Sequence, residues 1–189
     1  MTVATHIERS PADIQTQEQD MDKFLCFLLG DKSYGVNILK VKEIIEHTDI
    51  TPVPMTPDFF LGAINLRGRM VPVIDMARRL GMAAGTVSRR TCIVILELEM
   101  NHGRMEMGVM VDGVSQVADI PADQVEPAPA LGGLRTDFMR GMGKVNNRFV
   151  ILLNIECVLS MDDVALLKGI NDSASPMEEA PSWARPADV

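Results

Sequence analysis

Residues 62–75 read GAINLRGRMVPVID, and the fold of the whole chain depends on what this stretch forms. Two apolar runs separated by a short segment that ends in glycine are typical of a β-hairpin. Its tip is either the pair Arg67-Gly68 or the three residues 66–68, with Gly68 supplying the positive φ that a tight turn needs. An arginine at such a tip requires an explanation beyond the turn itself.

The chain contains this unit twice. Residues 62–76 align without a gap on residues 141–155, and the tip of the second copy is Asn146-Asn147. Asparagine tolerates positive φ, so the turn can be made without an arginine. We therefore predict that the first tip serves recognition. A solvated arginine without a specific role is the simpler alternative.

The first half of the unit is repeated as well. Apolar strands at 24–29 and 34–38 predict a hairpin, and residues 91–111 predict a second one like it. Short helices are predicted where the apolar spacing or a capping residue favours them. They lie at 38–45 after Asn37, at 56–62, at 76–80 after Asp75, at 155–159 after Asn154, and at 164–168 after Asp162.

Each copy of the unit thus supplies about five short strands and a helical turn or two. An open sheet of short strands would leave exposed edges, and curling into a small barrel removes most of that liability. We predict a mainly all-β fold of two tandem five-stranded barrels. The first occupies residues 23–88 and the second, with a C-terminal helix, residues 89–168, between disordered tails at 1–22 and 169–189.

The composition argues against several classes of function. The chain of 189 residues carries a formal net charge of −8, so the backbone of a nucleic acid would be repelled. Its three cysteines are far apart in apolar contexts, which indicates free thiols in a reducing compartment. The three histidines lack metal-ligand spacing, and neither a phosphate loop nor a nucleophile motif is present. We therefore predict no cofactor, no metal and no catalytic residues. We also predict no membrane span, because no apolar run is long enough.

Three stretches resemble the CheW family of bacterial chemotaxis adaptors: YGVNILKVKEI at 34–44, GAINLRG at 62–68 and VPVID at 71–75. Residues 108–114 fit the second half of that family, and the resemblance spans residues 23–168. It implies two SH3-like barrels and a non-catalytic adaptor without a cofactor. The implied partners are the cytoplasmic tips of methyl-accepting chemoreceptors and the regulatory domain of the histidine kinase CheA. The implied location is cytoplasmic, at receptor arrays, without membrane insertion.

The resemblance also implies a receptor- and kinase-binding surface at the junction of the barrels. Its apolar part would accept one face of a receptor helical hairpin, and Arg67 would fix the register through a carboxylate or a backbone carbonyl. For Ile38, Val41 and Val114, a place in the core is an equally good explanation. The residues carried over are Ile38, Val41, Glu43, Asn65, Arg67, Gly68, Cys92, Gly108 and Val114.

The sequence departs from the family in two ways. Residues 101–104 lengthen the strand pair after Cys92, and both tails are long. Three alternatives stay open: a paralogue that serves a non-flagellar chemosensory pathway, a regulatory fragment of a larger signalling protein, and a small barrel enzyme or ligand carrier. A deep polar pocket with perturbed carboxylates would favour the last of these, whereas a packed barrel interior would not.

Overall fold

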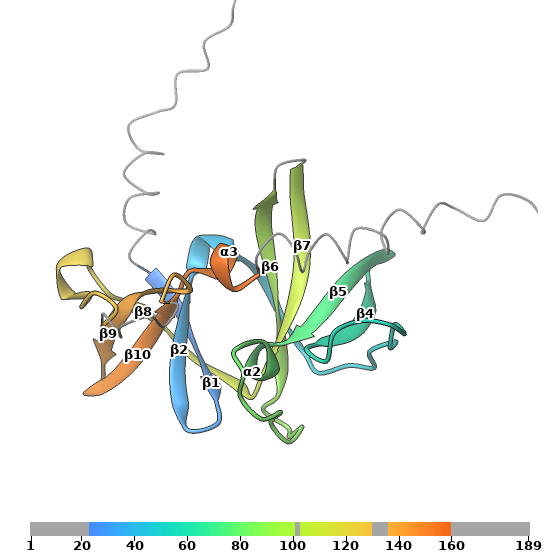
Figure 1. Ribbon diagram of the computed structural model, residues 1–189, viewed down its shortest axis with the longest axis horizontal. Coiled ribbons are helices and arrows are strands. Elements are labelled where there is room, and N and C mark those ends of the chain that lie inside the picture. Colours follow the sequence, from blue (N-terminus) through green and yellow to red (C-terminus); the bar gives the residue numbers. More distant parts are fainter. Residues whose placement is uncertain (1–22, 101–102, 130–135, 160–189) are drawn as a thin grey trace, which may run out of the picture.

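The computed structural model describes residues 23–100, 103–129 and 136–159. They form two five-stranded sheets, each curled into a small barrel, with a few short helices (Figure 1). Barrel A has the order β8-β1-β2-β10-β9, formed by Gly113–Asp119, Lys23–Leu29, Lys32–Asn37, Arg148–Leu153 and Met139–Val145. Barrel B has the order β3-β6-β7-β5-β4, formed by Val41–Glu46, Cys92–Met100, Gly103–Val111, Arg69–Asp75 and Phe60–Leu66.

The predicted fold class is confirmed, but the predicted order of the barrels along the chain is wrong. Barrel A joins the β1–β2 hairpin of the first half to β8, β9 and β10 of the second half, so blue and orange strands lie side by side (Figure 1). Barrel B joins β3, β4 and β5 of the first half to β6 and β7 of the second half. A cut between 23–88 and 89–168 therefore divides both barrels. The predicted tails at 1–22 and 169–189 lie outside the described residues.

Parallel pairing explains this exchange of strands. In barrel A, β10 runs parallel to β2, and in barrel B, β5 runs parallel to β7. Parallel neighbours need a long crossover connection, whereas antiparallel neighbours can be joined by a short hairpin. Each hairpin of the first half therefore completes a sheet together with strands that come from the other half.

The internal repeat is visible in the strand registers. Leu152 lies opposite Gly35 in barrel A, and Val73, its counterpart in the repeat, lies opposite Gly108 in barrel B. A Cβ at Gly35 would come within 2.9 Å of Leu152 Cδ2, and one at Gly108 within 3.0 Å of Val73 Cγ2. Both glycines are therefore required for the same close packing between parallel strands.

Both hairpin tips are two-residue turns. Arg67 and Gly68 have φ of 53° and 84°, and Asn146 and Asn147 have φ of 49° and 64°. Two successive positive φ values are characteristic of the type I′ turn, whose twist matches that of the flanking strands. The two-residue form of the predicted tip is thus the correct one. Arg67 occupies a conformation that asparagine or glycine adopts more readily.

The helices that follow the two repeated hairpins form as predicted. Asp75 caps α2 (Met76–Arg79), its carboxylate accepting a hydrogen bond from Arg78 N at 3.1 Å. Asn154 precedes α3 (Ile155–Val158), without a capping hydrogen bond from its side chain. The remaining short turn, η2, spans Ala122–Gln124, and the helix predicted at 164–168 lies outside the described residues.

One predicted helix is shorter than expected, and another is absent. After Asn37, whose side chain caps Leu39 N at 2.9 Å, the helical turn η1 covers only Ile38–Lys40, and β3 follows at once. Pairing of β3 with β6 outweighs the helical spacing of its apolar residues. Residues 56–62 form no helix either, because β4 pairs with β5 from Phe60 onward.

The apolar core has three parts. One cluster fills barrel A and one fills barrel B, with Leu152 and Val73 each fully buried. The largest cluster lies between the barrels and takes side chains from both, including Phe27, Tyr34 and Val94. We call this cluster the seam. It joins the two sheets into one packed unit, which positions the surfaces described next.

Candidate binding surface

An ion pair ties the tip of the β4–β5 hairpin to strand β3. Arg67 Nη1 and Nη2 donate to the two carboxylate oxygens of Glu43 at 3.1 and 2.9 Å. The Arg67 side chain is 73% exposed and that of Glu43 only 19%. The bidentate geometry fixes the orientation of the guanidinium while most of it stays in water.

The same tip holds two more of the predicted site residues. Gly68 N donates to Asn65 Oδ1 at 2.8 Å, which closes the turn that displays Arg67. Glu43, Asn65, Arg67 and Gly68 therefore come together as predicted. Strand β3 also connects the tip to the seam, because Val41, at its start, packs against the seam cluster.

A second charged group lies on the neighbouring strands. The Glu106 carboxylate on β7 accepts hydrogen bonds from Lys42 and from Arg69. Burial by itself would raise the pKa of Glu106, but the hydrogen bonds and positive charges of Lys42 and Arg69 outweigh it and lower that pKa below its ordinary value. We call the charged end of this barrel the mouth of barrel B, formed by Lys42, Glu43, Arg67, Arg69 and Glu106.

The predicted apolar residues lie at the seam. Ile38, Val41, Cys92 and Val114 are partly buried and pack against the seam cluster. They are therefore part of the core packing, yet each keeps some surface. The core interpretation therefore holds in part at these positions, and the binding interpretation stays a prediction.

The surroundings of Cys92 disfavour its thiolate form. Burial raises its pKa, and a hydrogen bond with the backbone of Val114 opposes that shift only in part. Cys26, Cys92 and Cys157 are all free, as the sequence predicts. A buried thiol with a raised pKa stays protonated and is a poor nucleophile.

Gly108 does not belong to a binding surface. It is buried in the β7 ladder, where an added Cβ would lie 2.9 Å from Ile93 Cγ2 inside barrel B. Its role is to let β5 and β7 approach, so it is corrected from a contact residue to a packing residue. A family motif includes structural and contact positions alike, and sequence alone does not separate them.

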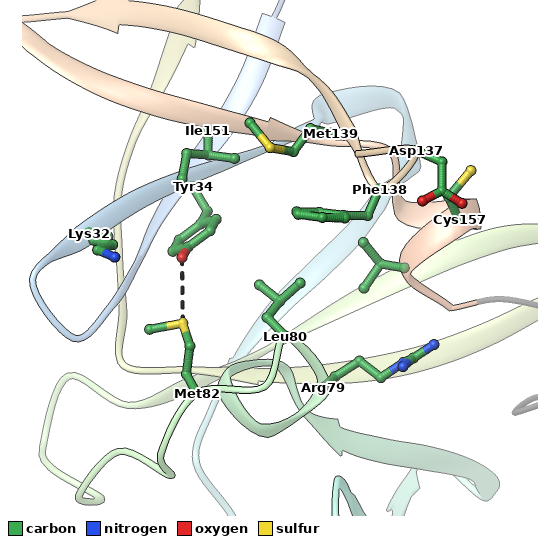
Figure 2. A pocket seen from close by; sticks show the side chains of 11 residues that line it. Lys32, Tyr34, Arg79, Leu80, Met82, Asp137, Phe138, Met139, Ile151 and Cys157 are labelled. Carbon is green, nitrogen blue, oxygen red and sulfur yellow. Dashed lines mark hydrogen bonds between the residues drawn. The ribbon is translucent and has the colours of Figure 1, made fainter. Parts of the chain in front are cut away.

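One pocket at the seam contains none of the predicted residues. Figure 2 shows Tyr34 from barrel A facing Met82, which follows α2, with the Tyr34 hydroxyl 3.4 Å from the Met82 sulfur. Phe138 and Leu80 point into the same space, whose volume is about 420 Å³. The repeat was the available signal, since Phe138 is the counterpart of Phe59, and both pack against the seam.

The structure argues against the alternative that this protein is a small barrel enzyme or a ligand carrier. Packed clusters fill both barrels, and the carboxylate with a shifted pKa, Glu106, is engaged by two cations in barrel B. A polar cavity exists, but it lies in barrel A and no carboxylate lines it. Within residues 23–100, 103–129 and 136–159, no cluster of His, Cys, Asp or Glu could hold a metal ion. In the same ranges no helix has the length and apolar character to cross a membrane.

Comparisons with known proteins agree with the geometry. The model of the CheW-like domain matches residues 23–163. The chemotaxis protein CheW of Klebsiella aerogenes is 38% identical over 152 residues, covering 80% of this chain and 89% of the relative. The chemotaxis protein CheW of Bacillus subtilis is 29% identical over 152 residues, covering 80% and 92%.

A solved structure shows the same fold. The scaffolding protein TtCheW from Thermoanaerobacter tengcongensis superposes with a TM-score of 0.67 at 28% identity, covering 86% of this chain and 96% of that one. The resemblance drawn from the three motifs is therefore confirmed, as is the prediction of a non-enzymatic protein, because proteins of this family are named as scaffolds and adaptors. From its domain match, its curated relatives and its fold, this chain belongs to the CheW family of chemotaxis proteins.

Proposed function

We propose that this chain is a cytoplasmic adaptor that couples the signalling tips of chemoreceptors to the regulatory domain of a CheA-type histidine kinase within receptor arrays. Family membership supports the scaffolding part of this role. The observation that carries the rest is the Arg67–Glu43 pair. It holds a mostly exposed guanidinium in one orientation against strand β3, two residues after Val41, which packs against the seam.

The chemistry of this surface suits a helical partner. Glu43 engages Nη1 and Nη2 of Arg67, and a guanidinium has five N–H donors, so donors are left for a carboxylate or a carbonyl of a partner. Ile38, Val41 and Val114 offer apolar contact at the seam. A helix can place an apolar face on such residues while a polar side chain reaches the arginine.

The variant Arg67→Asn tests this role directly. Asparagine tolerates the positive φ at this position and already stands at the equivalent tip of barrel A, so the turn should be kept while the guanidinium is removed. We expect binding to a receptor signalling tip, measured by pull-down and by titration calorimetry, to weaken about tenfold. Asn146→Gly, at the other tip, is the matched control and should leave binding unchanged.

Binding of the kinase regulatory domain should involve a second surface, with barrels pairing end to end. In the same assay Arg67→Asn should therefore affect the receptor more than the kinase. Undiminished binding of both partners by Arg67→Asn would refute the role of the arginine. Equal loss with Asn146→Gly would show that turn geometry matters rather than charge.

A further inference from the structure

The mouth of barrel A is the counterpart of the charged mouth of barrel B. Through the internal repeat, each polar residue of one mouth has an equivalent in the other. Two of these equivalences are visible as contacts: where Arg67 meets Glu43, Asn146 Nδ2 lies 3.5 Å from Gln116 Oε1. The mouth of barrel A consists of Ser33, Ser115, Gln116, Asn146 and Arg148, where barrel B has Glu106, Lys42, Glu43, Arg67 and Arg69.

Smaller side chains leave a cavity in barrel A. Ser33 replaces Glu106 and Ser115 replaces Lys42, so the groups that fill the mouth of barrel B are absent here. Cys26 likewise lines this cavity where barrel B has the larger Ile95. The resulting space has a volume of about 450 Å³ and is lined in part by Val145, Asn146 and Arg148 at the β9–β10 tip. It is large enough to admit a side chain.

The cavity is lined by a positive charge and by no carboxylate. Arg69 in barrel B is neutralised by Glu106, but its counterpart Arg148 lines the cavity without that carboxylate. The Arg148 side chain forms neither a hydrogen bond nor an ion pair with any residue in the described part of the chain. The Ser33 hydroxyl, in the position of the missing carboxylate, is equally unengaged by the described residues. The pocket thus offers a cation and a hydroxyl to an anionic group.

We propose that the mouth of barrel A binds the carboxylate of an acidic side chain supplied by a protein partner, with Arg148 as the main ligand and Ser33 as a second donor. The carboxylate would take the place that Glu106 occupies within barrel B. The assignment goes beyond the proposed coupling role and does not depend on the Arg67 surface, because the two mouths belong to different barrels.

The surroundings favour a protein over a free anion. Leu28 and Val145, both partly buried, line the cavity beside Arg148 and Ser33. Apolar side chains around a polar centre are typical of a protein contact. Lys144 precedes Val145 and therefore lies on the other face of the sheet, so it contributes charge to the region without lining the cavity.

Titration of the full chain followed by NMR tests the site. The probe is N-acetyl-glutamic acid amide, and the signals to follow are the Arg148 Nε–H and the Ser33 amide. We expect a saturable shift with a dissociation constant in the millimolar range, because one exposed bidentate contact supplies only a few kcal/mol. N-acetyl-glutamine amide should cause no shift. A blocked Leu-Glu dipeptide should bind at least about threefold tighter through the apolar lining residues Leu28 and Val145.

Two variants make the test decisive. Ser33→Glu places a carboxylate at the position that Glu106 has in barrel B. This side chain should occupy the site and reduce probe binding at least about tenfold. Arg148→Gln changes an exposed side chain and should abolish binding. Lys144→Gln is the control for general charge and should change binding less than about twofold. Thermal melting of each variant checks that the fold is retained.

The outcomes separate the alternatives. Binding of the blocked glutamate by wild type and its loss in both variants would support the site. Inorganic phosphate bound as tightly as the blocked glutamate, with no gain from the Leu-Glu dipeptide, would assign the pocket to free anions and overturn the proposal. Absence of a saturable shift, or equal binding by Arg148→Gln, would also overturn it, and neither result would bear on the Arg67 surface.

Discussion

The two barrels share a backbone plan but differ in the polar groups at their mouths. In barrel B, five charged side chains engage one another, and Glu106 is shared between Lys42 and Arg69. In barrel A, the equivalent residues are neutral except for Arg148, and they surround a cavity. The turn geometry is the same at both tips, with paired positive φ values. The comparison shows that the charges at the mouth of barrel B are not needed to build the fold.

This difference separates structural from functional requirements within one chain. A neutral Asn146–Gln116 contact stands where barrel B has the Arg67–Glu43 pair, and its donor and acceptor are farther apart. Exposed ion pairs contribute little to stability. An arginine held in a conformation that asparagine adopts more readily is therefore consistent with the proposed binding role of Arg67.

The largest effect is expected from truncating equivalent interior residues. Leu152→Ala in barrel A should lower the free energy of unfolding by about 3 kcal/mol, because Leu152 is fully buried and a cavity would remain. Val73→Ala in barrel B removes fewer carbon atoms and should cost about 2 kcal/mol. Urea denaturation measures both. Since each barrel contains strands from both halves of the chain, both variants should unfold in one transition; separate transitions would show that the barrels are independent.

A smaller effect should appear on acidification, and only for barrel B. The pKa of Glu106 is lowered in the folded state, so its contribution is present above the unfolded pKa and is lost as the pH falls through the folded pKa. Glu106→Gln should destabilise the protein at pH 7 by less than about 1 kcal/mol. The difference in stability between this variant and wild type should disappear at pH values below the ordinary glutamate pKa of about 4. Urea midpoints between pH 3 and pH 7 measure this difference in stability, with Ser33→Ala as the control in barrel A. A difference that stays constant with pH would contradict the stabilising role of the ionised Glu106 carboxylate.

The smallest effect on stability should come from the ion pair at the tip. Arg67→Asn, Glu43→Gln and the double variant together rebuild in barrel B the neutral pair of barrel A. Each change should alter the free energy of unfolding by less than about 1 kcal/mol, with a coupling of about 0.5 kcal/mol between them. A double-mutant cycle by thermal melting measures the coupling. Destabilisation of several kcal/mol would mean that the pair holds the fold together, and the comparison with Asn146 and Gln116 would fail.

Local signals were enough to predict the two repeated hairpins, their tips and the cap at Asp75, because each depends on residues close in the sequence. They were also enough to place Arg67 on a hairpin tip and to identify the family. The helix expected at 56–62 failed because strand pairing competes with local helix signals, and the pairing partner is remote.

What only the tertiary structure decided is which strands share a barrel and which site residues share a surface. Apolar periodicity indicates that a strand is buried, but it does not identify the strand with which it pairs. The exchange of strands between the two halves could therefore not be predicted from the sequence. The same limit applies to Gly108, which is buried within barrel B, and to the cavity beside Arg148, which exists only because smaller residues from separate strands meet there. Composition, repeats and motifs are properties of the chain, whereas contacts between remote residues arise only when the chain has folded.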